Sequence, residues 1–389
     1  MRIFHAVMRS PNLSDLVTSN IWYNNLYLPL VEMGHNMIEF DYNMYPLLLH
    51  ADPARPGNQE FIEIHRPHME SELLKQIRLE HNKKPIQLFF SYFYNSCISP
   101  SIIEEIKRLG IMTVNFYCNN VHQFHLVSEI ASTYDYCMVP EKVAMKKYIA
   151  IGANPIHIQM AANPNVYRPY LLTNEFDVTF AGQRYANRPQ IIDYLLRKGI
   201  KIHVWGPGWL PSTSVEKTYR NDNKRAILYS KIRKSGLHLP VKVVRWLYQQ
   251  PMEKRLHEIA GPSLTDEALI KLYSRSKISL GFSVVNNAVP KGEPDSHLRL
   301  RDFEAPMSGA FYATGYSEEL EEYYEIDKEI ICYKSKEELA DKIQYYLGHL
   351  TELEKIRKAG YQRAQRDHTW IHRFIQLFDI VGLKNIIYF

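Results

Sequence analysis

The sequence predicts an α/β protein with two doubly wound, parallel-sheet domains. Its 389 residues suffice for two domains of ordinary size. In both halves short apolar runs alternate with amphipathic helical patterns, which is typical of parallel sheets covered by helices on both faces. The polar stretch Thr173-Asn174-Glu175 interrupts this alternation and is expected to be a linker. We therefore expect one domain over residues 1–168 and a second over 176–367.

The first domain begins with an apolar run at its N-terminus. Six such runs are expected to form strands: Ile3–Val7, Met37–Phe40, Ile86–Phe90, Ile111–Phe116, Tyr136–Val139 and Ile156–Gln159. The clearest helical patterns between them are Ser19–Met33, Met69–His81, Ser101–Leu109 and Glu141–Ile149. Gly34, Gly110 and Gly152 follow three of these helices, where glycine commonly ends a helix.

The second domain repeats the alternation. Its expected strands are Val178–Ala181, Ile202–Trp205, Ile278–Phe282, Ala310–Thr314 and Ile330–Tyr333. Its expected helices are Gln190–Lys198, Asp266–Ser276 and Lys336–Leu347, followed by Glu352–Arg366 and Trp370–Val381. Thr265 and Ser335 are good N-cap residues, and Glu338 completes a capping box with Ser335. In such sheets ligands bind at the carboxyl ends of the strands, which predicts a site in a cleft between the domains.

Composition and motifs exclude several protein classes. Hydrophobic residues make up 46% and charged residues 23% of the chain, and no apolar run approaches the roughly 20 residues that span a bilayer. The four cysteines lie apart without metal-ligand spacing, which favours buried thiols in the cytoplasm. The dehydrogenase motif G-x-G-x-x-G is absent after the first strand, and neither G-x-S-x-G nor H-E-x-x-H occurs.

The positive charge is concentrated in an insert at residues 211–257. This basic insert holds eleven Lys and Arg against three Asp and Glu, an excess of eight in a chain whose net charge is +5. Within it, Val241–Tyr248 has an amphipathic pattern with a cationic edge. The insert is a candidate for contact with an anionic membrane or a lipid-linked acceptor. The alternative is a charged segment on the second domain that is exposed to solvent.

A loop-to-helix transition around Arg301 carries candidate site residues. Arg299, Arg301 and Glu304 lie where an irregular loop turns into a short helix. A helix N-terminus favours a diphosphate, arginines bind phosphate in a bidentate manner, and a carboxylate can accept hydrogen bonds from a ribose diol. The alternative is a surface ion pair of little consequence.

Two further stretches of the second domain are candidates for nucleotide binding. Gly182 follows the first strand and allows close approach of a ligand, and Arg184 and Arg188 lie in the loop after it. The alternative is a tight turn with solvated arginines. The backbone of Ser263 and Leu264 could hydrogen-bond the edge of a base.

In the first domain His122 follows the fourth strand. It is a candidate for contact with a sugar hydroxyl or for a catalytic base, and the alternative is a structural histidine.

These residues together resemble a known family. Its members carry similar motifs in the same order as Val178-Thr179-Phe180-Ala181-Gly182, Trp205-Gly206-Pro207-Gly208-Trp209, Gly261-Pro262, Arg301-Asp302-Phe303-Glu304 with Ser308-Gly309, and His368-Thr369-Trp370. The family is that of the CgeB-like, spore-maturation-type glycosyltransferases, related to glycosyltransferase group 1. The resemblance covers about residues 177–378 and is weaker before them.

The resemblance implies the GT-B architecture, with the nucleotide-sugar donor on the second domain, the acceptor on the first and no essential metal or other cofactor. It implies that Glu304 holds the donor ribose. It also implies that Arg184 or Arg188, with Arg301 and the backbone near Ser308 and Gly309, neutralises the diphosphate. The final segment, residues 368–389, would cross back to the first domain.

The sequence departs from related retaining families at one position. Those families carry a second Glu eight positions before the ribose-binding one, and here Ser296 stands at that position. This departure leaves the contact with the donor sugar and the stereochemical outcome open.

The resulting hypothesis is a bacterial, cytoplasmic glycosyltransferase, peripheral at the inner face of the membrane. It would move a sugar from a UDP-, GDP- or TDP-linked donor to a polysaccharide, glycolipid or glycoprotein acceptor, and it would not bind nucleic acid. One alternative is a catalytically silent scaffold or binding subunit of a surface-polysaccharide assembly. Another is a nucleotide-sugar epimerase or hydrolase on the same fold.

Overall fold

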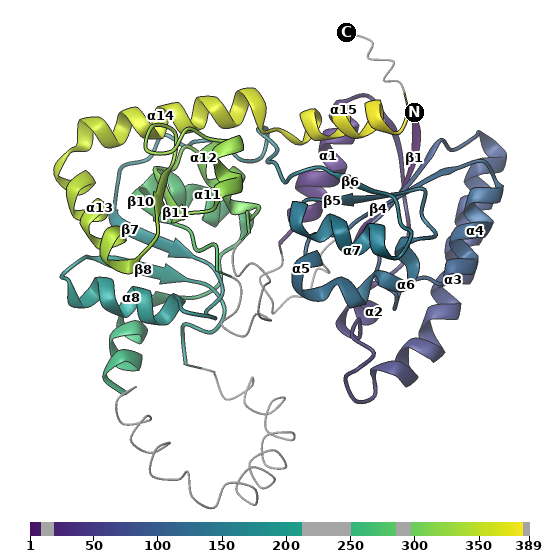
Figure 1. Cartoon of the computed structure of the whole chain (residues 1–389), viewed down its shortest axis with the longest axis horizontal. Coiled ribbons are helices and arrows are strands. Elements are labelled where there is room, and N and C mark those ends of the chain that lie inside the picture. Colours follow the sequence, from purple (N-terminus) through teal and green to yellow (C-terminus); the bar gives the residue numbers. More distant parts are fainter. Residues whose placement is uncertain (9–18, 212–249, 285–296, 384–389) are drawn as a thin grey trace, which may run out of the picture. The chain divides into compact units, whose positions relative to one another are not determined.

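The computed structural model describes residues 1–8, 19–211, 250–284 and 297–383. The described residues form two compact units (Figure 1). Unit 1 comprises Met1–Arg168, Val289–Met307 and Gln362–Phe389, and unit 2 comprises Pro169–Ala288 and Ser308–Tyr361. The division expected from the sequence is 1–168, 176–367 and 368–389. It differs chiefly at the described residues 297–307, which group with unit 1.

Unit 1 is built on a six-stranded parallel sheet of order β2-β1-β3-β4-β5-β6. Its strands are β1 Arg2–Ala6, β2 Asn36–Glu39, β3 Leu88–Ser91, β4 Met112–Phe116, β5 Tyr136–Val139 and β6 Pro155–His157. The sequence predicted all six. Strand β3 is buried along its whole length, as expected for a strand covered on both faces.

Most helices of unit 1 lie between these strands in the sequence, and two come from later parts of the chain. They are α1 Leu28–Glu32, α2 Tyr45–Leu49, α3 Asn58–Lys83, α4 Pro100–Arg108, α5 Asn120–Gln123, α6 Ser128–Ala131, α7 Met145–Ala150, α12 Arg301–Met307 and α15 Trp370–Ile380. Short 3-10 turns span Phe124–Leu126 and Lys142–Ala144. Helix α15 lies beside α1 (Figure 1) and packs Trp370 and Phe374 against Phe116 and Phe90.

One predicted helix of unit 1, Ser19–Met33, has a different form. A π-helix at Tyr23–Tyr27 precedes α1, and the N–H of Leu28 donates to the carbonyl of Tyr23. The next residue, Pro29, has no N–H to donate within an α-helical ladder, and its ring disfavours α-helical geometry one turn earlier. The helical pattern in the sequence is therefore correct, but its hydrogen-bond register changes at the proline.

Unit 2 has a second six-stranded parallel sheet, of order β12-β11-β10-β7-β8-β9. Its strands are β7 Phe176–Ala181, β8 Ile202–Trp205, β9 Ala260–Gly261, β10 Ser276–Leu280, β11 Tyr312–Gly315 and β12 Ile331–Tyr333. The sequence predicted all except β9. That strand has two residues and joins the edge of the sheet through β8, so it lacks the apolar run that marks a buried strand.

The helices of unit 2 are α8 Arg188–Arg197, α11 Asp266–Arg275 and α13 Lys336–Gly348, with a further helical stretch at 250–258 and a 3-10 turn at Glu318–Glu322. Helix α13 packs on α8 (Figure 1). The predicted N-caps Thr265 and Ser335 are confirmed, because their hydroxyls accept the N–H groups of Ala268 and Glu338. Helix α14, Leu350–Asp367, begins in unit 2 and ends in unit 1.

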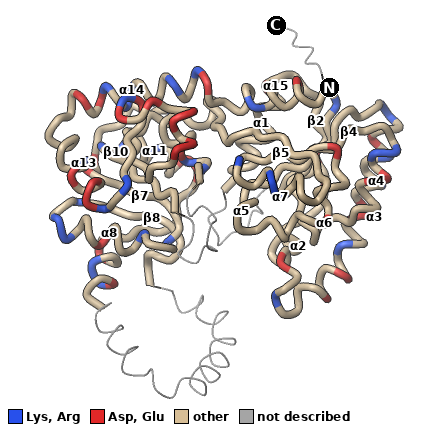
Figure 2. Tube along the Cα trace, viewed as in Figure 1, with Lys and Arg blue, Asp and Glu red and all other residues tan. Residues whose placement is uncertain are grey.

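Charged residues lie mainly on the helices and loops, while the strands are largely uncharged (Figure 2). Within the four described ranges, no helix is both long and apolar enough to cross a membrane. Most of the basic insert, residues 212–249, lies outside the described residues, and so does Ser296.

Candidate functional site

The topology of unit 2 selects one place for a ligand. Strands β7 and β10 are neighbours, but the chain continues from β7 to β8 on one side and from β10 to β11 on the other. The loops that leave the two carboxyl ends therefore diverge, and ligands of such sheets bind at this switch point. The loop after β7 begins at Gly182 and contains Arg184.

This loop is held by the segment that follows β8. The N–H of Gly182 donates to the carbonyl of Trp205 at 2.8 Å, and the N–H of Arg184 donates to the carbonyl of Pro207 at 3.0 Å. The indole N–H of Trp209, a fully buried side chain, donates to the carbonyl of Gly182 at 2.7 Å. The backbone of Arg184 is thus fixed in place independently of its side chain.

Glycine allows these two segments to approach each other. Gly206 has φ +129°, and a Cβ added there would lie 2.5 Å from the carbonyl oxygen of Gly182. A Cβ on Gly208 would lie 3.3 Å from the Cβ of Arg184. Any larger residue at position 206 would force the two loops apart.

Five of the six strands of unit 2 end at a glycine or are followed directly by one. These glycines are Gly182, Gly206, Gly261, Gly281 and Gly315, after or at the ends of β7, β8, β9, β10 and β11. Added Cβ atoms at the last three would lie 2.1–2.3 Å from side-chain atoms of neighbouring strands or loops. At this edge of the sheet glycine therefore leaves room for neighbouring side chains, and at Gly206 for the backbone of Gly182.

Arg184 carries the accessible positive charge of the loop. Its Nη1 donates to Oε2 of Glu253 at 2.8 Å, and its Nη2 donates to Oε1 of the same carboxylate. The two side chains keep 18% and 30% of their surface exposed. These hydrogen bonds lower the pKa of Glu253, so its carboxylate is ionised near neutral pH.

Arg188, the first residue of α8, has a different role beside this loop. It is 7% exposed and donates to the carbonyl of Gln183 at 2.8 Å and to the hydroxyl of Tyr185 at 2.7 Å. Its guanidinium lies 3.8 Å from the centroid of the Tyr185 ring. Arg188 therefore braces the loop from within, and the structure separates the two arginines that the sequence left as alternatives.

The remaining predicted residues of unit 2 fall at two places. Ser263 and Leu264 follow β9, at the carboxyl edge. Ser308 and Gly309 follow the C-terminal end of α12 and precede β11, so they lie at the amino edge of the sheet. Gly309 lines an open pocket of about 480 Å³ there with Ser274 and Arg357, and Arg357 donates to the carbonyl of Ser276 at the start of β10. The structure does not bring Ser308 and Gly309 together with Arg184.

Arg301 and Glu304 belong to α12 and to unit 1. The Glu304 side chain is almost completely buried, and its Oε1 accepts a hydrogen bond from Nδ2 of Asn25 at 3.3 Å. Phe303 packs against His368, with ring centroids 5.5 Å apart. At the start of the helix the N–H of Arg299 donates to Oδ2 of Asp302 at 2.6 Å. These contacts attach α12, the helix predicted to bind the ribose, to unit 1.

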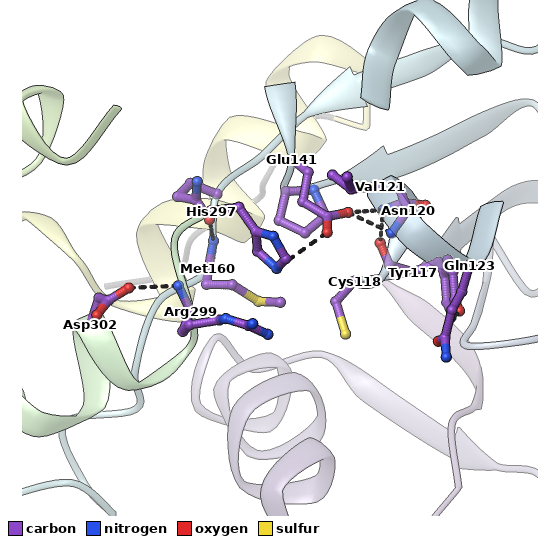
Figure 3. Close-up of polar contacts among 12 residues, drawn as sticks. Tyr117, Cys118, Asn120, Val121, Gln123, Glu141, Met160, His297, Arg299 and Asp302 are labelled. Carbon is purple, nitrogen blue, oxygen red and sulfur yellow. Dashed lines mark hydrogen bonds and ion pairs between the residues drawn. The ribbon is translucent and has the colours of Figure 1, made fainter. Parts of the chain in front are cut away.

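A second polar cluster lies at the carboxyl edge of the sheet in unit 1 (Figure 3). Glu141, just after β5, accepts from the N–H and Nδ2 of Asn120 at 2.6 and 2.8 Å. Its other oxygen lies 3.6 Å from Nε2 of His297. Both side chains are buried.

Burial governs the charge of this cluster. Burial raises the pKa of Glu141 to about 7, while burial and the nearby Arg299 lower the pKa of His297 to about 3. At neutral pH the histidine is therefore neutral, and the carboxyl group is close to its midpoint of ionisation. A carboxyl group with such a pKa is a common feature of functional sites and also of buried structural networks.

The predicted catalytic residue His122 lies in α5 beside this cluster, with its ring centroid 6.3 Å from that of His297. Sequence reasoning missed Glu141, although its place two residues after a buried strand was a usable signal. It assigned no role to His297. In the described ranges, no three His, Cys, Asp or Glu side chains come together as metal ligands would.

Known proteins resemble this chain in two ways: a family model matches part of its sequence, and solved structures share its fold. Residues 188–379, just under half of the chain, match a family model described as glycosyl transferase-like. No curated protein matches the sequence. The structure of this chain is similar to that of the sucrose-phosphate synthase from Thermosynechococcus elongatus, with 12% identity, a TM-score of 0.61 and coverage of 98% of this chain and 99% of that one.

Two further solved structures are similar along their whole length. Anabaena HepE in complex with UDP and glucose has 11% identity and a TM-score of 0.55, over 99% of this chain and 100% of that one. A glycosyltransferase from Rickettsia africae has 11% identity and a TM-score of 0.54, over 98% of both chains. The predicted GT-B fold is thereby confirmed. Together the family match and the fold support a glycosyltransferase.

Proposed function

We propose that the protein transfers a sugar from a nucleotide diphosphate donor to a polysaccharide, glycolipid or glycoprotein acceptor, without a metal ion. The observation that carries the proposal is the loop after β7, where Arg184 stands at the switch point of a glycine-lined sheet edge. Fixed cations stabilise a departing diphosphate, and an arginine can supply the charge that a metal supplies elsewhere. The UDP complex of HepE, a protein of similar fold, supports a nucleotide-sugar donor.

In this proposal each residue of unit 2 has a distinct task. Arg184 binds the diphosphate in a bidentate manner. Arg188 keeps the loop in shape, because its donors already bind Gln183 and Tyr185. The backbone of Ser263 and Leu264, beyond β9, binds the base. We leave Ser308 and Gly309 out of the phosphate site, because the C-terminal end of a helix presents carbonyl groups to a ligand.

The assignments in unit 1 stay predictions with their own tests. Glu304 remains the candidate for the ribose, Arg301 for the diphosphate and His122 for the acceptor. Glu304→Gln keeps the shape of the side chain beside Asn25 and removes its charge. If Glu304 binds the donor, this variant weakens nucleotide binding by about tenfold while its melting temperature stays within a few degrees of wild type.

The experiment that tests the proposal is a thermal-shift panel with UDP, GDP, TDP, CDP and ADP on wild type and Arg184→Ala. We expect one nucleotide to stabilise the wild type by several degrees and to have a much smaller effect on the variant. Stabilisation by none of the five would contradict the proposal and favour the silent scaffold. Equal stabilisation of the two proteins would place the diphosphate elsewhere.

A turnover assay with the matching nucleotide sugar separates the enzymatic alternatives. A transferase releases the nucleoside diphosphate faster when a suitable acceptor is added. Free sugar formed equally well without an acceptor would indicate a hydrolase, and an isomerised nucleotide sugar would indicate an epimerase.

We also propose peripheral contact of the basic insert, residues 211–257, with the inner face of the membrane. Support comes from its eleven basic and three acidic residues. Flotation with anionic and with neutral liposomes tests this idea. Binding that does not depend on anionic lipid would refute it.

A further inference from the structure

Arg184, the proposed diphosphate ligand, already has an anionic partner within unit 2. Two guanidinium nitrogens face the two carboxylate oxygens of Glu253, one at 2.8 Å and the other in closer contact. Paired N–H···O bonds of this kind are also the geometry in which arginine binds phosphate oxygens. Glu253 thus makes the contact that a phosphate group would make.

The two partners come from different elements and stay accessible. Arg184 lies in the loop after β7, while Glu253 lies 69 positions later, in the helix at 250–258. Their side chains are 18% and 30% exposed, so a ligand can reach the pair from solvent. Arg188 differs in both respects, because it is buried and binds groups of its own loop.

The surroundings allow the pair to open without moving the loop. The backbone of Arg184 is fixed by Pro207, and a Cβ added at Gly208 would lie 3.3 Å from the Cβ of Arg184. Its guanidinium lies 5.8 Å from the centroid of the Trp209 ring, a distance at which the attraction is weak. On the other side of Glu253, Nε2 of His257 lies 3.7 Å from Oε2, so an imidazole stays beside the carboxylate when Arg184 leaves.

We infer that Glu253 competes with the donor's diphosphate for Arg184 and thereby sets the donor affinity of the site. The inference rests on the proposed function and adds a residue to it. Binding exchanges one anion for another on the same guanidinium. Glu253 holds Arg184 in a binding-competent place while no donor is bound, and it lowers the affinity for the donor by the strength of the pair.

The test is a calorimetric titration of UDP, or of whichever of the five nucleotides binds, into wild type and Glu253→Gln. The variant keeps the shape of the side chain and removes the competing charge. We expect its Kd to be roughly fivefold lower. This corresponds to about 1 kcal/mol of binding free energy, the strength expected of a partly exposed ion pair. An unchanged or higher Kd would overturn the inference.

Unit 2 provides a matched control in Glu175. This carboxylate makes a similar bidentate contact with Arg275, at the linker beside the start of β10. Glu175→Gln removes the same charge and the same type of pair, so its Kd should stay within about twofold of wild type. A decrease equal to that of Glu253→Gln would show a general effect of net charge, and the inference would fail.

A double variant separates competition at Arg184 from other effects. In an Arg184→Ala background, Glu253→Gln should no longer tighten binding, because the two anions no longer share a cation. A persistent gain would overturn the inference. Binding by wild type with no gain in Glu253→Gln refutes the inference alone, whereas the absence of binding by both proteins refutes the proposed function as well.

Discussion

The carboxyl edges of the two sheets are built in opposite ways. In unit 2, five strands end at or directly before glycine. In unit 1, none of the six described strands does, and residues such as Tyr92 and Tyr117 follow the strand ends. Tyr92 packs on Tyr117 and Phe116 with ring centroids 5.8 and 5.5 Å apart.

The difference shows how one topology produces two kinds of surface. Large side chains fill the edge of unit 1, and polar groups there, including Glu141 and His297, are buried. In unit 2 glycine allows neighbouring main chains to come together, and a charged side chain such as Arg184 projects from a fixed loop. We therefore expect the edge of unit 1 to respond to loss of side-chain volume and the edge of unit 2 to respond to its gain.

The largest effect is expected from Trp370→Ala in unit 1. Trp370 is fully buried and packs its ring on Phe116, the last residue of β4, with centroids 6.0 Å apart. Removing the indole leaves a cavity and should lower the free energy of unfolding by about 4 kcal/mol, measured by denaturant titration. Ile380→Ala, at a half-exposed position of the same helix, should change it by less than about 0.5 kcal/mol. Similar losses of unfolding free energy in both variants would contradict the conclusion that side-chain packing at this edge stabilises unit 1.

Gly206→Ala tests the close approach of backbones in unit 2. The added methyl would meet the carbonyl of Gly182 at 2.5 Å, in a left-handed conformation, and should cost about 3 kcal/mol of unfolding free energy. Gly199→Ala provides the control, since its φ is +77° but no atom lies within 4 Å of the added Cβ. There we expect only the conformational cost of about 1 kcal/mol. Equal costs at the two positions would mean that packing does not require glycine at this edge.

The buried carboxyl group of unit 1 should give a pH dependence of stability. Its folded pKa is raised from 4.5 to about 7, so the stability it contributes is present below about pH 4.5 and is lost as the pH rises through 7. Between pH 5 and pH 8 the wild type should therefore lose about 2 kcal/mol more unfolding free energy than Glu141→Gln. His297 contributes in the opposite sense, losing stability as the pH falls from 6.5 towards 3, and it does so in both proteins. Parallel pH profiles would show that Glu141 is ionised in the folded protein.

The features that could be predicted from the sequence are those that local residue patterns determine. Buried apolar runs marked all but one of the strands that the structure describes, and the exception, β9, has two residues and no such run. The loop at Gly182–Arg184 could be found because ligand loops follow strand ends in parallel sheets. Proline changed the local outcome in the Ser19–Met33 helix, since Pro29 shifts the hydrogen bonding before it.

Contacts between distant residues could not be read from the sequence. Glu253 lies 69 positions after Arg184, and Asn25 lies 279 positions before Glu304. Their pairing depends on how loops and helices pack, which no local pattern encodes. The phosphate site assigned to Ser308 and Gly309 followed from a family motif, and the length of α12 then separates these residues from the N-terminus of that helix.

The most direct measurement of the central claim is UDP affinity in wild type, Arg184→Ala and Arg275→Ala. Both arginines form bidentate pairs with a glutamate in unit 2, but only Arg184 stands at the carboxyl edge of the sheet. We expect Arg184→Ala to raise the Kd by at least about tenfold and Arg275→Ala to leave it within about twofold of wild type. Equal affinity in all three proteins would contradict the placement of the diphosphate at this loop.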